Sequence, residues 1–89
     1  MDLTGAIRDV LGAEGRLGVP VEEIGDEDDL YKRGLTSHAS VRLMLALEDH
    51  FSVEFPDALL TKATFESIGS IRRAIEGLGL AGGPASNGG

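Results

Sequence analysis

The sequence predicts an all-α fold, a small four-helix bundle with three longer helices and one short helix. Three stretches, within 3–11, 41–51 and 65–78, carry apolar residues at the three- and four-residue spacing of a helix with one buried face. Between the second and third stretches lies the segment 56–60, Pro-Asp-Ala-Leu-Leu. A proline at its start is typical of a short helical turn, which we expect to be the fourth helix.

The 89 residues are enough for one small domain. We expect a folded domain over residues 1–78 and a disordered tail over 79–89, because the tail is rich in Gly, Ser and Asn and has little to bury. A domain of this size has only a marginal core, so a deep enzyme cleft is not expected.

Charge and cysteine content narrow the functional classes. The net charge of −7 argues against a nucleic-acid partner, which requires a basic patch, and suits partners with basic surfaces. The chain has no cysteine, so any thiol chemistry must come from a cofactor. The N-terminus lacks the pattern of a signal peptide, and no apolar run is long enough for a bilayer. We therefore expect a soluble cytoplasmic protein with no membrane partner.

The first helix is expected to begin after Asp2, a plausible cap, and to end between Gly12 and Gly18. Its apolar face comprises Leu3, Ile7, Val10 and Leu11. A long connection follows and extends to Thr36. Because long connections in small domains are normally functional or packed, we expect apolar residues to hold this one against the bundle. These residues are Leu17, Val19, Val21, Ile24 and Leu30.

The same connection carries the acidic run 26–29, which raises the question of a calcium site. A calcium loop starting at Asp26 needs glycine at its sixth position and glutamate at its twelfth. Those positions hold Tyr31 and Ser37. We therefore predict no metal site and interpret the run as a solvated acidic loop.

The central helix is the most informative stretch. Gly34 permits a tight backbone turn, and either Thr36 or Ser37 can cap the helix that follows. Ser37 is thus expected where a helix N-terminus meets solvent. A phosphate ester there would face free N–H groups and the positive end of the helix dipole. The predicted buried stripe of this helix comprises Val41, Leu43, Met44, Leu47 and Phe51.

The remaining core anchors lie towards the C-terminus. Phe51, Val53 and Phe55 are expected to anchor a turn in the core, and Thr64 is expected to cap the last helix. The apolar face of that helix comprises Phe65, Ile68, Ile71, Ile75 and Leu78. These stripes are more simply core than a lipid-binding surface.

Taken together, these residues resemble the acyl carrier proteins over roughly 3–78. The matching positions are Asp29-Leu30, Gly34, Ser37, Val41, Leu43, Ala46-Leu47-Glu48, Phe51 and Phe55-Pro56-Asp57. The resemblance implies that Ser37 carries 4′-phosphopantetheine, whose thiol holds an acyl or aminoacyl group as a thioester. Thr36 and His38 depart from the usual Asp and Leu on either side of the serine. This form looks most like freestanding carriers served by dedicated acyl- or amino-acid-activating ligases.

The implied function is that of a monomeric carrier, not a catalyst, which presents its cargo to partner enzymes. The implied partners are a phosphopantetheinyl transferase, an activating ligase, and downstream acyl-transferring or modifying enzymes. The second helix carries Arg42 and lacks the strong acidity usual in fatty-acid carriers, which favours a specialised or secondary-metabolite pathway. The predicted partner contacts are Leu35, His38, Arg42, Met44, Leu45, Glu48, Asp49 and Asp57.

Two other functional classes stay open. One is a small helical interaction module in which Ser37 is never modified. The other is a small hydrolase or transferase that uses Ser37 with a histidine. The second is weaker, because neither His38 nor His50 comes with a recognisable orienting acid or oxyanion hole. Whether the interior admits part of an acyl chain also stays open.

Overall fold

The computed structural model describes residues 3–15 and 17–78. This part of the chain forms helices and turns without a strand, which confirms the all-α prediction. None of its helices is both long enough and apolar enough to cross a membrane. The elements in chain order are α1 (Leu3–Glu14), the 3-10 turn η1 (Val21–Glu23), α2 (Ser37–Phe51), the 3-10 turn η2 (Asp57–Leu59) and α3 (Ile68–Gly77). The predicted cap Asp2 and the predicted tail 79–89 lie outside the described residues.

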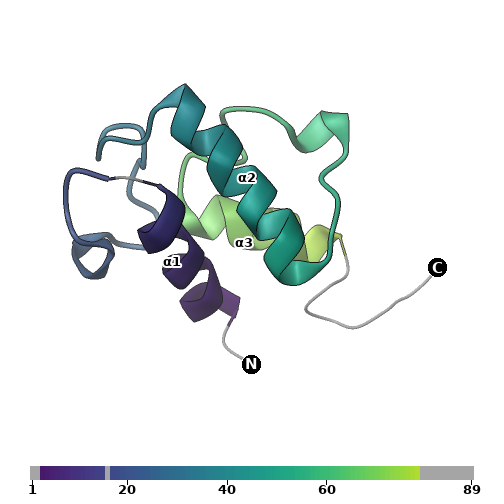
Figure 1. Ribbon diagram of the computed structural model, residues 1–89, viewed down its shortest axis with the longest axis horizontal. Helices are drawn as coiled ribbons and strands as arrows, with labels where there is room; N and C mark the ends of the chain where they lie inside the picture. The colour runs from purple at the N-terminus through teal and green to yellow at the C-terminus, as the bar shows by residue number, and fades with distance from the viewer. Residues whose placement is uncertain (1–2, 16, 79–89) are drawn as a thin grey trace.

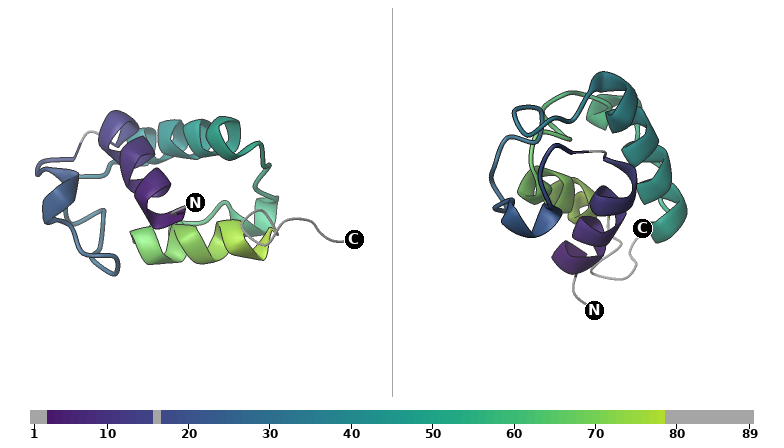
Figure 2. Two further views of the ribbon diagram at one scale, coloured as in Figure 1. Left: turned by 90° about the horizontal axis from the view of Figure 1, so that it is seen from below. Right: turned by 60° about the vertical axis from the view of Figure 1, so that its left-hand side comes forward.

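The three α-helices enclose the core between them (Figure 1). α1 packs against both α2 and α3. Seen from below, α2 and α3 form two layers, and α1 crosses from one to the other (Figure 2). The long connections before and after α2 close the remaining sides of the bundle. The start of α2 is thereby left at one end of the molecule, beside both connections.

The helical periodicity places most of the predicted core correctly. The fully buried side chains of the helices are Ile7, Leu11, Leu43, Leu47, Ile68, Ile71 and Ile75. Val41 is an exception, because it is 53% exposed, and Met44 is only half-buried. The buried stripe of α2 runs through Ala39, Leu43 and Leu47, at four-residue spacing. Val41 lies two residues from Ala39 and Leu43, so the helix turns it to the opposite face.

The long first connection is packed, as predicted. Ile24 and Leu30 are buried in the core, and the other apolar residues of the connection pack against it. Two backbone hydrogen bonds tie it to the start of α3. The Leu30 amide donates to the Glu66 carbonyl at 2.7 Å, and the Gly69 amide donates to the Asp26 carbonyl at 2.7 Å. The connection is therefore a fixed part of the bundle.

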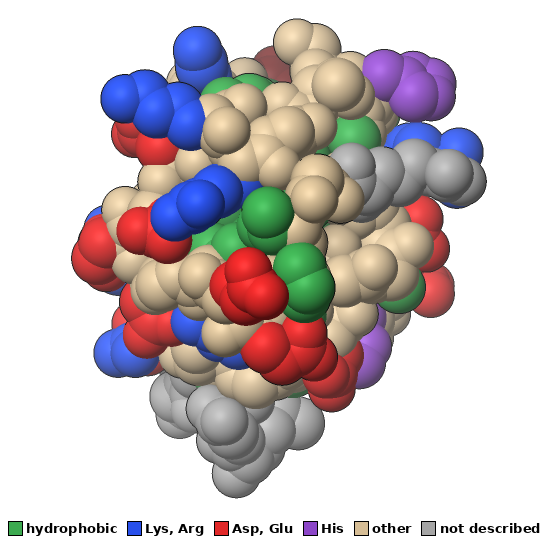
Figure 3. Space-filling view, turned by 90° about the vertical axis from the view of Figure 1, so that its left-hand side faces the viewer, with side chains coloured by type: hydrophobic (Ala, Val, Ile, Leu, Met, Phe, Trp, Pro, Cys, Tyr) green, Lys and Arg blue, Asp and Glu red, His purple; other side chains and the backbone are tan. Residues whose placement is uncertain are grey.

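Three acids of this connection, Asp26, Glu27 and Asp28, pair with arginines. Arg8 contacts Asp26 at 2.6 Å, and Arg73 contacts Glu27 at 3.3 Å. The backbone amide of Gly25 and the guanidinium of Arg33 both donate to Asp28, and they hold the pKa of its carboxyl below the usual range. On the face that contains this connection, acidic and basic side chains are interspersed (Figure 3). Within the described residues, no three His, Asp or Glu side chains gather as a metal site would require.

The start of α3 differs from the prediction, because Ser67 caps it and Thr64 does not. The Ser67 hydroxyl accepts from the Ser70 amide at 3.0 Å, and the Ser70 hydroxyl accepts from the Ser67 amide at 3.0 Å. The chain completes a separate turn, closed by the Thr64 amide on the Thr61 carbonyl, before the helix begins. Thr64 is 8% exposed, and its carbonyl accepts from the Ser70 hydroxyl. Reciprocal serine capping of this kind satisfies two otherwise unpaired amides.

Candidate functional site

The start of α2 is shaped by a glycine and a threonine. Gly34 has φ of 112°, a conformation that side-chain-bearing residues rarely adopt, and it turns the chain into the helix. Thr36 is the N-cap, since its hydroxyl accepts from the Ala39 amide at 3.0 Å. Of the two predicted capping residues, Thr36 therefore has this role. Ser37 becomes the first residue of the helix.

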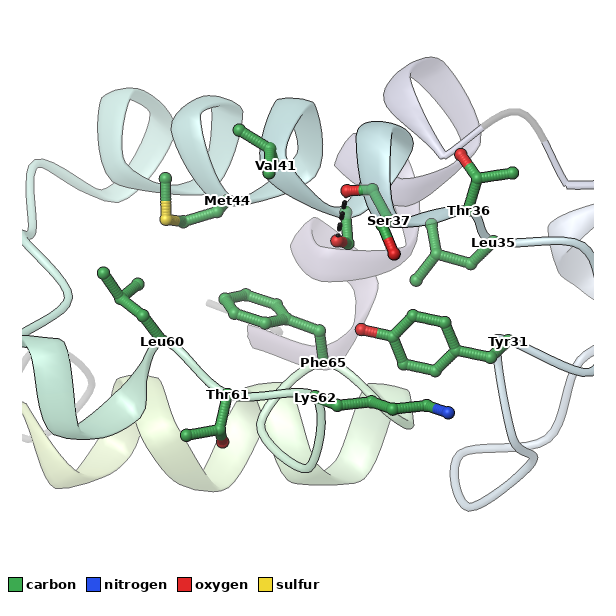
Figure 4. Close-up of a pocket in the computed structure, with 11 residues that line it drawn as sticks. Tyr31, Leu35, Thr36, Ser37, Val41, Met44, Leu60, Thr61, Lys62 and Phe65 are labelled. Atoms are coloured by element: carbon green, nitrogen blue, oxygen red, sulfur yellow. Dashed lines mark hydrogen bonds between the residues drawn. The ribbon is translucent and has the colours of Figure 1, made fainter.

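Ser37 is exposed and its hydroxyl is free to react. Its carbonyl accepts from the Ser40 hydroxyl at 2.7 Å, the dashed line in Figure 4. Within the described part of the chain, the Ser37 hydroxyl itself makes no hydrogen bond. The first amides of a helix lack partners inside the helix and stabilise negative charge nearby. An anionic group attached to Ser37 would therefore lie in a favourable field.

The described residues around Ser37 do not form a catalytic triad. His38 and His50 are exposed, and among the described residues neither one hydrogen-bonds to Ser37 or to a carboxylate. His50 instead lies edge-on to Phe51, with ring centroids 4.7 Å apart. An unactivated serine hydroxyl is a weak nucleophile, because it needs an adjacent base. The geometry fits a serine that is modified by another enzyme better than one that catalyses.

A groove of about 630 Å³ opens beside Ser37 (Figure 4). One wall is α2, and the other is formed by residues 60–65 together with the end of the first connection. Its lining residues are Tyr31, Leu35, Thr36, Ser37, Ser40, Val41, Met44, Leu60, Thr61, Lys62 and Phe65. Leu35 and Phe65 belong to the buried core, so the groove lies on the surface of a filled interior.

The predicted partner contacts divide into two groups. His38, Arg42, Leu45, Asp49 and Asp57 are exposed, and all but Asp57 lie on α2. Leu45 is 55% exposed, and among the described residues Val41 and Leu60 are also large apolar side chains that remain exposed. Arg42 also reaches Glu14 of α1, with 3.7 Å between the charged atoms. These five residues remain available to a partner.

The other three predicted contacts have roles inside the molecule. Leu35 is 3% exposed, so its side chain belongs to the core and the groove floor, and we do not retain it as a partner contact. Met44 is half-buried in the groove wall. Glu48 is half-buried and accepts a hydrogen bond from the Phe55 amide at 2.9 Å, which ties the end of α2 to the chain after it.

Sequence reasoning missed the second wall of the groove. Tyr31, Leu60 and Lys62 are brought to Ser37 by the packing of two connections, which no periodic pattern marks. A weak signal was present in Leu60, an apolar residue at the end of the predicted short turn 56–60 that had no assigned place in the core. It is 44% exposed.

A protein-family model and an individual known protein both match most of this chain. The family model described as the phosphopantetheine attachment site matches residues 2–75. An aminoacyl carrier protein from Agrobacterium fabrum strain C58 is 46% identical over 74 residues, which covers 83% of this chain and 89% of that protein.

Solved structures that contain carrier proteins also match this chain. One crystal structure holds an engineered Bradyrhizobium japonicum glycine:[carrier protein] ligase with a carrier protein from Agrobacterium tumefaciens and ATP. The match to it has a TM-score of 0.83 at 45% identity and covers 84% of this chain and 97% of that chain. Another holds the Bradyrhizobium japonicum ligase with glycylated carrier protein. That match has a TM-score of 0.70 at 26% identity and covers 81% of this chain and 96% of that chain.

Proposed function

Because the chain belongs to the phosphopantetheine-attachment family of acyl and aminoacyl carrier proteins, we propose that Ser37 is the residue to which its arm is attached. The protein is a carrier that holds an acyl or aminoacyl group as a thioester on 4′-phosphopantetheine. The single observation that carries the assignment to Ser37 is its position. It is an exposed hydroxyl on the first residue of α2, at the mouth of a groove.

The residues around Ser37 fit a 4′-phosphopantetheine arm. The arm supplies the thiol that a chain without cysteine lacks. Thr36 fixes the helix start by capping it, and the positive end of the helix dipole favours the negative phosphodiester. The groove beside Ser37 offers apolar walls of Val41, Met44 and Leu60 to the rest of the arm.

The cargo is proposed to be an amino acid. Support comes from the relatives, since one is an aminoacyl carrier protein and others are bound to a glycine:[carrier protein] ligase. We propose three classes of partner for this chain, namely a phosphopantetheinyl transferase, an amino-acid-activating ligase and downstream enzymes that use the loaded group, in a specialised pathway. The protein itself does no chemistry on the cargo. We also propose that residues 57–65, which contain η2, take the place of a short fourth helix.

The test is to incubate the apo-protein with coenzyme A and a broad-specificity phosphopantetheinyl transferase. Intact mass should show one added arm, and tandem mass spectrometry of the peptide that spans 34–42 should place it on Ser37. Attachment at Thr36 or Ser40 would overturn the assignment. No attachment with several transferases would argue for the unmodified interaction module.

A ligase is expected to recognise the exposed apolar and cationic face of α2. Leu45→Ala should weaken ligase binding by about 1–2 kcal/mol, mainly through faster dissociation, because buried apolar anchors govern how long a complex lasts. Arg42→Glu should mainly slow association, and the effect should shrink with salt. Surface plasmon resonance against an amino-acid-activating ligase separates the two rates.

The matched control for Arg42→Glu is Arg72→Glu. Arg72 is an exposed arginine that lies on α3, a different helix from Arg42, and pairs with Glu76 at 3.2 Å. This variant carries the same charge change and should bind with nearly wild-type rates. Equal kinetics for wild type, Leu45→Ala and Arg42→Glu at low and moderate salt would place the interface elsewhere.

A further inference from the structure

The groove beside Ser37 contains a cation held by an aromatic ring. The Lys62 ammonium lies 5.0 Å from the centroid of the Tyr31 ring, within the range of a cation–π interaction. Both side chains line the same groove as Ser37. Figure 4 shows the Tyr31 phenol extending into the groove below Ser37, with the Lys62 side chain running beneath the ring.

The environment of Lys62 differs from that of the arginines. Each arginine that the structure describes pairs with a carboxylate, as the five ion pairs show. Lys62 has no such pair among the described residues, although the chain carries 15 acids against eight Lys and Arg. Of the described residues that line the groove, Lys62 is the only charged one, and none of them is a carboxylate that would compete for it or repel an anion.

We propose that Lys62 is the counter-ion that positions the phosphodiester of the arm on Ser37, with Tyr31 as the residue that holds Lys62 in place. The proposal rests on Ser37 being the attachment residue. An ammonium group is a compact point charge that suits a phosphate oxygen. The Tyr31 ring lies over the Lys62 ammonium without neutralising its charge, and the Tyr31 hydroxyl is a second donor in the same groove. Together they direct the base of the arm along the groove instead of into solvent.

The experiment first confirms complete loading by intact mass, which separates failure of this inference from failure of the carrier assignment. Apo- and holo-protein are then compared by proton and phosphorus-31 NMR. In wild type, attachment of the arm should shift the ring resonances of Tyr31 and the ε-methylene resonance of Lys62. The phosphorus resonance should move with salt, because the ion pair is screened at about 1 M salt, where the Debye length is about 3 Å.

Three variants sharpen the test. Lys62→Gln should abolish the salt dependence of the phosphorus resonance, and Lys62→Arg should retain it. Tyr31→Phe keeps the ring and should retain most of the effect, whereas Tyr31→Leu should reduce it. The matched control is Lys32→Gln, which removes the only other lysine of the chain, an exposed residue outside the groove.

A second measurement is how far Lys62 protects the terminal thiol of the arm from a disulfide reagent. Modification of the terminal thiol by a disulfide reagent should be about two- to fivefold faster in holo Lys62→Gln than in wild type, the scale of an exposed ion pair. Holo Lys32→Gln should react at the wild-type rate. The inference is overturned if fully loaded wild type shows no shift at Tyr31 or Lys62, or if the two glutamine variants behave alike.

Discussion

Ser37→Ala should abolish attachment of the arm while leaving the fold unchanged. The loss should be complete, because alanine has no oxygen to form the ester with the phosphate. The fold should tolerate the change, since the Ser37 side chain is exposed and its hydroxyl bonds to no described residue. The helix cap belongs to Thr36, and its bond to the Ala39 amide does not involve the Ser37 side chain. Alanine also has the highest helix propensity.

Two measurements check this expectation. Intact mass after transferase treatment should show no added arm for Ser37→Ala, and thermal unfolding should place its free energy of unfolding within about 0.5 kcal/mol of wild type, as for other exposed substitutions. Ser40→Ala is the matched control, because it removes the neighbouring hydroxyl that donates to the Ser37 carbonyl. Full loading of Ser37→Ala, or loss of loading in Ser40→Ala with a normal melt, would contradict the assignment.

The helices and most of their buried faces were predictable because α-helical periodicity is local. Ile68, Ile71 and Ile75 repeat at three and four residues and are all fully buried. Ile7 and Leu11 in α1 lie four residues apart and are also fully buried. Such patterns depend only on the rotation per residue of a helix, so neighbouring residues in the sequence are sufficient to detect them.

The sequence-based predictions failed where the choice of a buried helix face or of a capping residue depends on distant parts of the chain. Val41 fits the spacing of a buried stripe, yet the bundle uses the face of Ala39 and Leu43, and Val41 turns outward. Thr64 and Ser67 are both plausible caps by type. The chain selects Ser67 because Ser70 can return a hydrogen bond to it, and because the turn that ends near Thr64 is already closed on Thr61.

The position of the candidate attachment residue was predictable, but its surroundings were not. Gly34 and Ser37 lie four residues or fewer from the helix start that they define, so the local pattern was sufficient. The groove wall opposite Ser37 comes from Leu60 and Lys62, which reach it only when the long connections pack against the core. Tyr31 and Lys62 meet across about thirty residues of sequence, a separation for which hydrophobic periodicity carries no information.

Phe51→Ala should be the most destabilising of the substitutions considered. Phe51 is 5% exposed and is the last residue of α2, where its ring belongs to the core cluster. Truncation of a buried phenylalanine removes its burial and leaves a cavity, at a cost of about 3–5 kcal/mol. Small domains unfold with a free energy of only about 5–15 kcal/mol, so much of the stability would be lost.

The backbone leaves little room for relaxation around this site. Ser52 follows Phe51 in the left-handed conformation with φ of 55°, and the Glu48 carboxylate holds the Phe55 amide at 2.9 Å. These features restrain the backbone that follows Phe51, which favours the upper part of the expected range. The cost should appear as a melting temperature lower by more than about 10 °C, since one kcal/mol corresponds to about 4–8 °C at this size.

Urea denaturation followed by circular dichroism measures the loss directly. Leu45→Ala provides the control, because it removes a large apolar side chain from the same helix at a position that is 55% exposed. It should change the free energy of unfolding by no more than about 0.5 kcal/mol. The slope against urea should stay the same in both variants if both still fold to the same compact state. A melting temperature for Phe51→Ala equal to that of Leu45→Ala would mean that the buried face of α2 does not extend to its last turn.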